Sequence, residues 1–194
     1  MKTRKIVGWG ALGLGLATLA NGVLGVYEHN LEQPAYTVVA KDGAFELRDY
    51  PPVLVAQTAV PGERSVALST GFQRLAGYIF GNKQEKIKMT APVLSDSVGA
   101  AWRTRFVMPA RFTAATLPPM PDGVTAAKLP ARRMAVVRFA GLGSGPQVAE
   151  QEARLREWLT GQGLKATGDA VTAFYNSPFV APPFRRNEVM IPVG

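Results

Sequence analysis

Two segments of the chain carry apolar residues at the three- and four-residue spacing that is typical of an amphipathic helix. In the first segment, residues 64–80, these positions are Val66, Leu68, Phe72, Leu75, Ala76 and Ile79. The second helix is predicted over residues 146–160, with Val148, Leu155, Trp158 and Leu159 on its apolar face. Gly71 and Gly77 interrupt the first pattern, and two interpretations remain possible. Either the segment is one helix in which a glycine allows another element to pack closely, or it consists of two short helices. Ser65 or Ser69 is expected to cap a turn of this segment.

Alternation of apolar and polar residues predicts strands on both sides of each helix. They cover residues 36–43, 45–50, 53–60, 86–94 and 101–109 in the first half, and 124–129, 134–139, 171–175 and 187–191 in the second. The halves share the order β-β-α-β-β, and their ends, residues 103–109 and 186–192, are similar in sequence. This order predicts an α+β domain made from two repeats, with a curled or closed antiparallel sheet and both helices packed outside it.

The N-terminus has the pattern of a targeting segment. Lys2, Arg4 and Lys5 precede an uncharged run of 21 residues, Ile6–Val26. At about 1.5 Å per residue, this run can span the hydrocarbon core of a bilayer as a helix. We expect residues 1–26 to be a signal anchor that places the rest of the chain on the non-cytoplasmic side, periplasmic in a bacterium. The alternative is a signal peptide cleaved near Ala20, which would release a secreted domain. Residues 27–35 are then a linker and residues 36–194 the domain.

Composition excludes several kinds of chemistry. The chain has no cysteine and one histidine, His29, so it has no disulfide framework, thiolate metal site or cysteine nucleophile. A serine triad would depend on His29 alone. The 22 basic residues outnumber the 14 acidic ones, but the basic clusters fall on different predicted elements. We therefore expect a binding protein, not an enzyme, with no metal centre and no nucleic-acid partner.

The best candidate for a binding site is apolar. The face of the first helix and the proline-rich segment 175–184 combine bulky hydrophobic residues, and Arg185 and Arg186 follow directly. Such a pair of elements suits a flat apolar ligand with carboxylates, which the arginines would pair. In the alternative interpretation the segment caps the core and the arginines are surface charges. The glycine-rich run 141–146 lacks the lysine and hydroxyl of a phosphate loop and is interpreted as a turn.

Six short motifs, in order, resemble those of the SOUL haem-binding protein family. They are Phe45–Pro51, Gly71–Asn82, Lys86–Val93, Arg105–Pro109, Pro119–Asp122 and Arg185–Val189. The resemblance covers about residues 36–194. It implies a distorted antiparallel β-barrel of two β-β-α-β-β repeats with two outer helices, similar to the bacterial effector-binding domains.

The resemblance also implies a function and a site. The implied function is envelope-tethered binding of haem or related tetrapyrroles, for sequestration or transfer. The alternative is a general binding module for hydrophobic small molecules with no haem role. By position, the implied site comprises Phe72, Leu75, Ala76 and Ile79 of the first helix, and Phe179, Val180 and Ala181 of the later loop.

Two departures from the family pattern affect the expected mode of binding. No histidine falls within the domain to serve as an axial ligand of the iron. The positions where some members place lysines near the haem propionates are Gly77 and Ala181 here, so Arg74, Arg185 or Arg186 are the candidate replacements. Haem, where it binds, is therefore expected to be held mostly by burial, with micromolar affinity.

Overall fold

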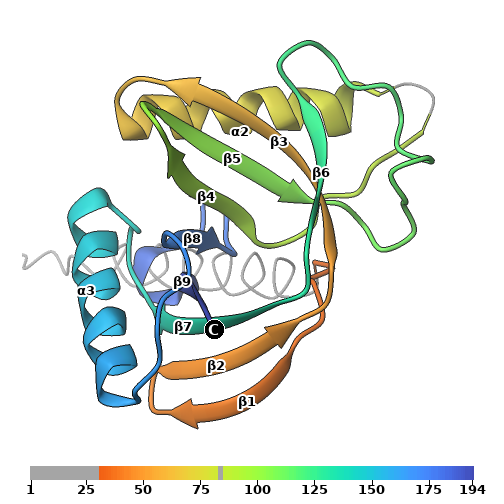
Figure 1. Ribbon diagram of the computed structural model, residues 1–194. Helices are drawn as coiled ribbons and strands as arrows, with labels where there is room; N and C mark the ends of the chain where they lie inside the picture. The colour runs from red at the N-terminus through yellow and green to blue at the C-terminus, as the bar shows by residue number, and fades with distance from the viewer. Residues whose placement is uncertain (1–30, 83–84) are drawn as a thin grey trace, which may run out of the picture.

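The computed structural model describes residues 31–82 and 85–194, which form one antiparallel sheet and two long helices (Figure 1). The first half contains β1 (Thr37–Asp42), β2 (Phe45–Tyr50), β3 (Val53–Pro61), α2 (Arg64–Gly81), β4 (Val93–Val98) and β5 (Ala101–Val107). The second half contains β6 (Thr125–Leu129), β7 (Arg132–Phe139), α3 (Gly145–Gly161), β8 (Val171–Phe174), a 3₁₀ turn (Pro182–Phe184) and β9 (Asn187–Val193).

The sheet confirms the predicted duplication. Its strand order is β1-β2-β7-β9-β8-β4-β5-β3-β6, so exchanging the two repeats reverses the order of the eight strands from β2 to β6. β4 pairs with β8 at the centre, where Leu94 lies opposite Ala173. Leu94 also lies opposite Arg105, and Ala173 opposite Glu188, so the registers on the two sides correspond. The two repeats are therefore related by an approximate two-fold axis through the β4–β8 pair.

The sheet is curled but not closed, which corrects the predicted β-barrel. β1 and β6 are the two ends of the strand order and do not pair with each other. Both are short, and every residue of β1 is exposed. Short exposed edge strands of this kind end a sheet without inviting further pairing. The result is a half-barrel with two helices.

Each helix covers the strands of its own half. α2 packs on β3 and β5, and α3 packs on β7 and β9, as Figure 1 shows at the top and the left of the view. Leu75, Ile79 and Phe106 belong to the cluster of buried side chains under α2. Leu155 and Leu159 belong to the corresponding cluster under α3. The periodicity of the sequence therefore identified part of each buried helix face, but Val66 and Phe72 of the predicted stripe are exposed.

Helix α2 is continuous, which settles the alternative left by its glycines. Glu63 is its N-cap: one carboxylate oxygen accepts hydrogen bonds from the backbone N–H groups of Ser65 and Val66, so the predicted serine caps are wrong. A Cβ atom at Gly71 would lie 2.5 Å from Oγ1 of Thr104, whereas one at Gly77 would have no neighbour within 4 Å. Gly71 is thus a close-packing position and Gly77 is not.

One predicted strand begins later than expected. The sequence predicts a strand over residues 86–94, but β4 begins at Val93. The preceding segment instead folds against the end of β5, where the Thr90 hydroxyl donates to the carbonyl oxygen of Val107 over 2.6 Å. Leu31 and Glu32 lie beside this segment, since the Ala91 N–H donates to the carbonyl of Glu32.

The predicted signal anchor over residues 1–26 lies outside the described residues. Within residues 31–82 and 85–194, no helix is both long enough and apolar enough to cross a membrane.

The two glycines of α2 provide a matched test of this packing. Gly71→Ala is expected to destabilise the full chain by about 1–3 kcal/mol, because the added methyl group meets Thr104. Gly77→Ala is expected to stabilise it by about 1 kcal/mol, because alanine favours an open helical position. Urea unfolding followed by circular dichroism measures both. Equal effects of the two substitutions would contradict the close approach at Gly71.

Candidate functional site

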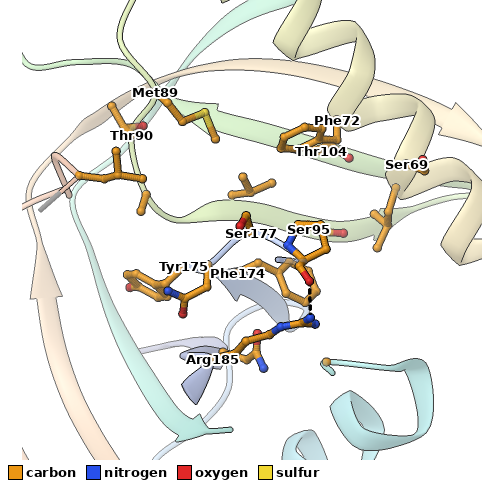
Figure 2. Close-up of a pocket in the computed structure, with 18 of the residues that line it drawn as sticks. Ser69, Phe72, Met89, Thr90, Ser95, Thr104, Phe174, Tyr175, Ser177 and Arg185 are labelled. Atoms are coloured by element: carbon orange, nitrogen blue, oxygen red, sulfur yellow. Dashed lines mark hydrogen bonds between the residues drawn. The ribbon is translucent and has the colours of Figure 1, made fainter. Parts of the chain in front are cut away.

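A groove lies between the two helices, above the central strands β4 and β8 that neither helix covers. Its volume is about 1320 Å³, and it is formed by both halves of the chain. α2 forms one side, and the segment after β8 forms the other (Figure 2). Residues 88–91 with Leu31 and Glu32 lie at one part of its rim, and the turn of Leu142, Gly143 and Ser144 lies at another. We refer to this cavity as the groove.

Most of the groove surface is apolar. On α2, Leu68 and Phe72 are one turn apart and both face the groove. Phe72 is 41% exposed and packs edge-to-face on the buried ring of Phe106, with 5.3 Å between ring centroids. Further apolar lining comes from Met89, Val93, Phe174 and Pro178. Rings held in place on a sheet and a helix offer a preformed surface to a flat apolar ligand.

A row of hydroxyl side chains crosses the sheet at the base of the groove. Thr58 lies opposite Thr104, Thr104 opposite Ser95, and Ser95 opposite Thr172, on four successive strands. Ser95 is 2% exposed and Thr104 is 1% exposed, and both line the groove. The hydroxyls of Thr58, Thr104 and Ser95 have no hydrogen-bond partner among the described residues. Buried hydroxyls without partners are uncommon, since each has lost its hydrogen bonds to water.

Arg64, the first residue of α2, lies at the same groove one turn before Leu68. Its guanidinium lies over the ring of Trp102, 5.5 Å from the centroid. One terminal nitrogen, Nη2, is buried and has no hydrogen-bond partner among residues 31–82 and 85–194. Burial lowers the pKa of Arg64 from its ordinary value, and Glu63 offsets this only in part. The side chain is therefore a partly desolvated cation with unused donor capacity.

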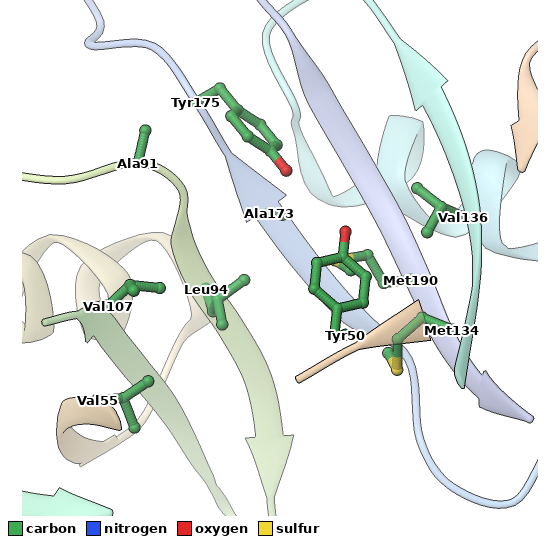
Figure 3. Close-up of a cluster of buried hydrophobic side chains, with 10 residues drawn as sticks. All are labelled: Tyr50, Val55, Ala91, Leu94, Val107, Met134, Val136, Ala173, Tyr175 and Met190. Atoms are coloured by element: carbon green, nitrogen blue, oxygen red, sulfur yellow. The ribbon is translucent and has the colours of Figure 1, made fainter. Parts of the chain in front are cut away.

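A buried ionic cluster lies behind the groove, on the concave side of the sheet. Glu188 is fully buried and accepts hydrogen bonds from Arg48, Arg186 and the hydroxyl of Tyr175. Tyr175 also lines the groove, and in Figure 3 its hydroxyl points toward the cluster that contains Tyr50. Burial and the nearby Glu188 carboxylate raise the pKa of Tyr175. This hydroxyl is therefore a fixed donor within the fold.

The structure brings only part of the sequence-predicted site to the groove. Phe72 and Arg185 line it. Leu75, Ile79 and Val180 are buried in the core, and Ala76 and Ala181 are half-buried outside the groove lining. Phe179 is 78% exposed, and Arg74 is exposed on α2 near Gly123.

Two of the predicted arginines have partners within the fold. Arg185 donates to the carbonyl oxygens of Val180 and Pro178, each over 2.7 Å, and so fixes the loop of the groove (Figure 2). Arg186 stacks on Tyr175 and pairs with Glu188 at 2.7 Å. Both arginines therefore have contacts within the fold, while the buried Val180 agrees with the other part of the alternative, that the segment packs on the core.

Sequence reasoning missed Arg64, Ser95, Thr104 and the turn at Leu142–Ser144. Arg64 follows the N-cap and looks like an ordinary charged helix start. Ser95 and Thr104 meet only through the β4–β5 register, which the sequence does not reveal. Of these features, only the glycine-rich turn could have been found from the sequence, because it lies between a predicted strand and a predicted helix. Its Gly143 N–H is used internally, because it donates to Oε1 of Gln147 over 2.9 Å.

A curled antiparallel sheet with two flanking helices and a large apolar groove between its halves defines an α+β domain with a candidate site for a small molecule. The chain belongs to the SOUL heme-binding protein family, whose model matches residues 31–192. It is also 37% identical over 78 residues to Heme-binding protein 2 of Mus musculus, a match that covers 37% of this chain and 38% of the mouse protein.

Solved structures with low sequence identity share the fold. The C-terminal domain of EcmrR superimposes with a TM-score of 0.60 at 12% identity, covering 82% of this chain and 98% of that domain. A protein from Listeria innocua described as a hydrolase gives 0.55 at 14% identity, over 80% and 94% of the two chains. SAV2435 bound to tetraphenylphosphonium gives 0.50 at 11% identity, over 77% and 93%.

The buried ionic cluster is expected to stabilise the fold independently of any ligand. Glu188→Gln leaves Arg186 without its buried counter-charge and Arg48 with Glu46 alone, so we expect a loss of about 3–5 kcal/mol in the free energy of unfolding. The control is Asp49→Asn, which breaks the exposed ion pair with Arg133 and is expected to cost less than about 1 kcal/mol. Urea unfolding compares the two. Similar losses would contradict a dominant role for the cluster.

Proposed function

We propose that this protein binds haem or a related tetrapyrrole in the groove, for sequestration or transfer, and does not transform it. The observation that carries the proposal is the groove itself: a largely apolar cavity of about 1320 Å³ in a chain of the SOUL family. Its size exceeds the roughly 300–1,000 Å³ typical of sites for drug-sized ligands, so it has room for a macrocycle.

The groove residues favour burial over iron ligation as the source of affinity. Met89 and Lys88 are the lining side chains that could offer an iron ligand, since the Tyr175 hydroxyl already donates to Glu188. Burial of a few hundred Å² of ring at about 25 cal/mol per Å² offers several kcal/mol before the entropy cost of association. Micromolar affinity is the expected result, with the metal-free ring binding nearly as well as haem.

The same residues support a binding role without catalysis. Glu32 is the single carboxylate among the lining residues, and its Oε1 accepts a hydrogen bond from the backbone N–H of Ala110. A general base would need a carboxylate or imidazole free to reach the ligand. Chromatography of hemin recovered after incubation with the protein is expected to show unaltered pigment.

A second candidate is general capture of hydrophobic small molecules. The observation in its favour is that SAV2435, which shares the fold, is bound to tetraphenylphosphonium, a bulky aromatic ion. The half-open rim of the present groove would admit ligands of several shapes. Equal affinity for hemin and for unrelated apolar dyes would favour this candidate.

The uncharged run of residues 6–26 after three basic residues supports tethering to a membrane, with the domain on its non-cytoplasmic side. We propose this location together with the function. In intact cells, we expect the domain to resist added protease. In spheroplasts, whose outer envelope is removed while the inner membrane stays intact, we expect the protease to digest the domain, which shows that it lies outside that membrane.

Phe72 tests the location of the binding site. Hemin is titrated into the full chain in mild detergent, with protein-free micelles as the blank, and the Soret band is followed. We expect saturable one-to-one binding by the unmodified chain. Phe72→Asp is expected to weaken it at least about tenfold, because a carboxylate replaces an apolar surface of the groove.

The matched control is Phe184→Asp, at an aromatic residue that is 68% exposed and outside the groove lining. Its affinity should equal that of the unmodified chain, and circular dichroism should show both variants folded. Binding unchanged by Phe72→Asp would place the site elsewhere. Absence of saturable binding would overturn the tetrapyrrole function.

A further inference from the structure

Positively charged residues outnumber negatively charged ones in the lining of the groove. Its lining contains Arg64, Lys88 and Arg185 but a single carboxylate, Glu32. Neither Arg64 nor Lys88 forms an ion pair within residues 31–82 and 85–194. Arg185 is bonded to two loop carbonyls, which neutralise no charge. The lining of the groove therefore carries a net positive charge, which the Glu63 carboxylate next to Arg64 offsets only in part.

Arg64 is the cation best placed to use this charge on a ligand. Lys88 is exposed at the rim, where water and salt screen it. Arg64 is partly desolvated against Trp102, and its buried Nη2 has no partner. A guanidinium in such surroundings gains more from a carboxylate than one in water, because the pair forms at a lower effective dielectric constant.

The N-terminus of α2, the helix end next to Arg64, does not compete for an anion. The Glu63 carboxylate already accepts from the first N–H groups of α2. At the start of α3, the Gly143 N–H donates to Gln147, whereas the N-cap Ser144 makes no side-chain cap hydrogen bond. The buried donors of this part of the groove that have no partner among the described residues are Nη2 of Arg64 and the hydroxyls of Thr104 and Ser95.

The hydroxyls of Thr104 and Ser95 lie on the same face of the sheet as the ring that the Arg64 guanidinium covers. Thr104 and Trp102 are two residues apart on β5, so their side chains share a face of the sheet, and Arg64 covers Trp102. Ser95 lies directly opposite Thr104 on β4. The groove thus has a polar end at Arg64 and the hydroxyl row, and an apolar part around Phe72, Phe174 and Met89.

We propose that the groove binds its ligand as an amphipathic anion, with a ligand carboxylate paired by Arg64 and oriented by the hydroxyls of Ser95 and Thr104. This inference rests on the proposed function and narrows it. It gives Arg64 the role of a specificity-determining residue, and it predicts discrimination against neutral esters and lipophilic cations of similar size.

Protoporphyrin IX and its dimethyl ester separate charge from shape, because they share the ring and differ in their carboxylates. Binding to the full chain in detergent is followed by fluorescence, with protein-free micelles as the blank. We expect the diacid to bind about tenfold more tightly than the ester, with a preference that falls as salt rises. Arg64→Ala should abolish the preference, and Arg64→Lys should keep part of it, because lysine retains the charge but not the planar fork.

Arg74→Ala is the matched control, since Arg74 is an exposed arginine of the same helix outside the groove lining. It should leave the preference unchanged. Ser95→Ala removes a hydroxyl with no protein partner, so it should weaken diacid binding about threefold without lowering stability. Arg64→Glu should reverse the selectivity, weakening the diacid further and strengthening tetraphenylphosphonium.

The outcomes separate this inference from the proposed function. Tight binding of both rings with a preference that survives Arg64→Ala would overturn the role of Arg64 and leave tetrapyrrole binding intact. If neither ring binds saturably, the proposed function fails, and the anion 8-anilinonaphthalene-1-sulfonate becomes the probe. Loss of its binding in Arg64→Ala but not in Arg74→Ala would support the anion site alone. Equal binding in the two variants would overturn that site as well.

Discussion

The pairing of β4 with β8 is the constraint on which the rest of the structure depends. Three pairings join strands of different repeats, β2–β7, β4–β8 and β3–β6, and β4–β8 is the one at the centre of the strand order. Leu94 opposite Ala173 places the two-fold axis at this pair, and the helices then fall over β3–β5 and β7–β9 on either side. Two helices placed symmetrically about the axis leave the central strands uncovered. The groove is thus a geometric consequence of duplicating a β-β-α-β-β unit.

The chemistry of the site comes from the differences between the repeats. The first residue of α2 is Arg64, and the first residue of α3 is Gly145, so the charge at the groove is present on one side only. Equivalent positions of β5 and β9 hold residues of opposite charge, Arg105 and Glu188. Each is buried and forms an ion pair, Arg105 with Asp96 and Glu188 with Arg48. Each of these two buried charges is paired within its own surroundings, as the low dielectric of the interior requires. Arg64 and Arg132 depart from that rule, since each has a buried nitrogen without a partner among the described residues, and Arg64 is the one that lines the groove.

The sequence predicted most of the fold because periodicity reports burial. Both helices agree with the predicted ranges to within one residue at each end, and the repeat order is confirmed. The closure of the barrel was wrong because edge pairing depends on the lengths and curvature of β1 and β6, which alternation does not encode. The late start of β4 reflects tertiary packing of Thr90 on Val107, another contact without a local signal.

The candidate site was harder to predict for the same reason. The strongest apolar positions of α2, such as Leu75 and Ile79, are the ones buried in the core. The groove is lined by the neighbouring flank of the helix, where Arg64, Ser69 and Phe72 mix polar and apolar character. Family resemblance pointed to the helix and the loop that line the groove, but the face of the helix that lines it depends on tertiary packing.

The ionic cluster behind the groove bears on how a ligand would exchange. Glu188 holds Arg48, Arg186 and Tyr175 in place through contacts that lie within the protein, so the inner surface of the groove is formed before any ligand arrives. A preformed site loses little conformational entropy on binding, which raises affinity. The half-exposed ring of Phe72 leaves one side of the groove open to solvent. A preformed base with an open side supports the proposed transfer, because a bound ring could leave without local unfolding of the domain.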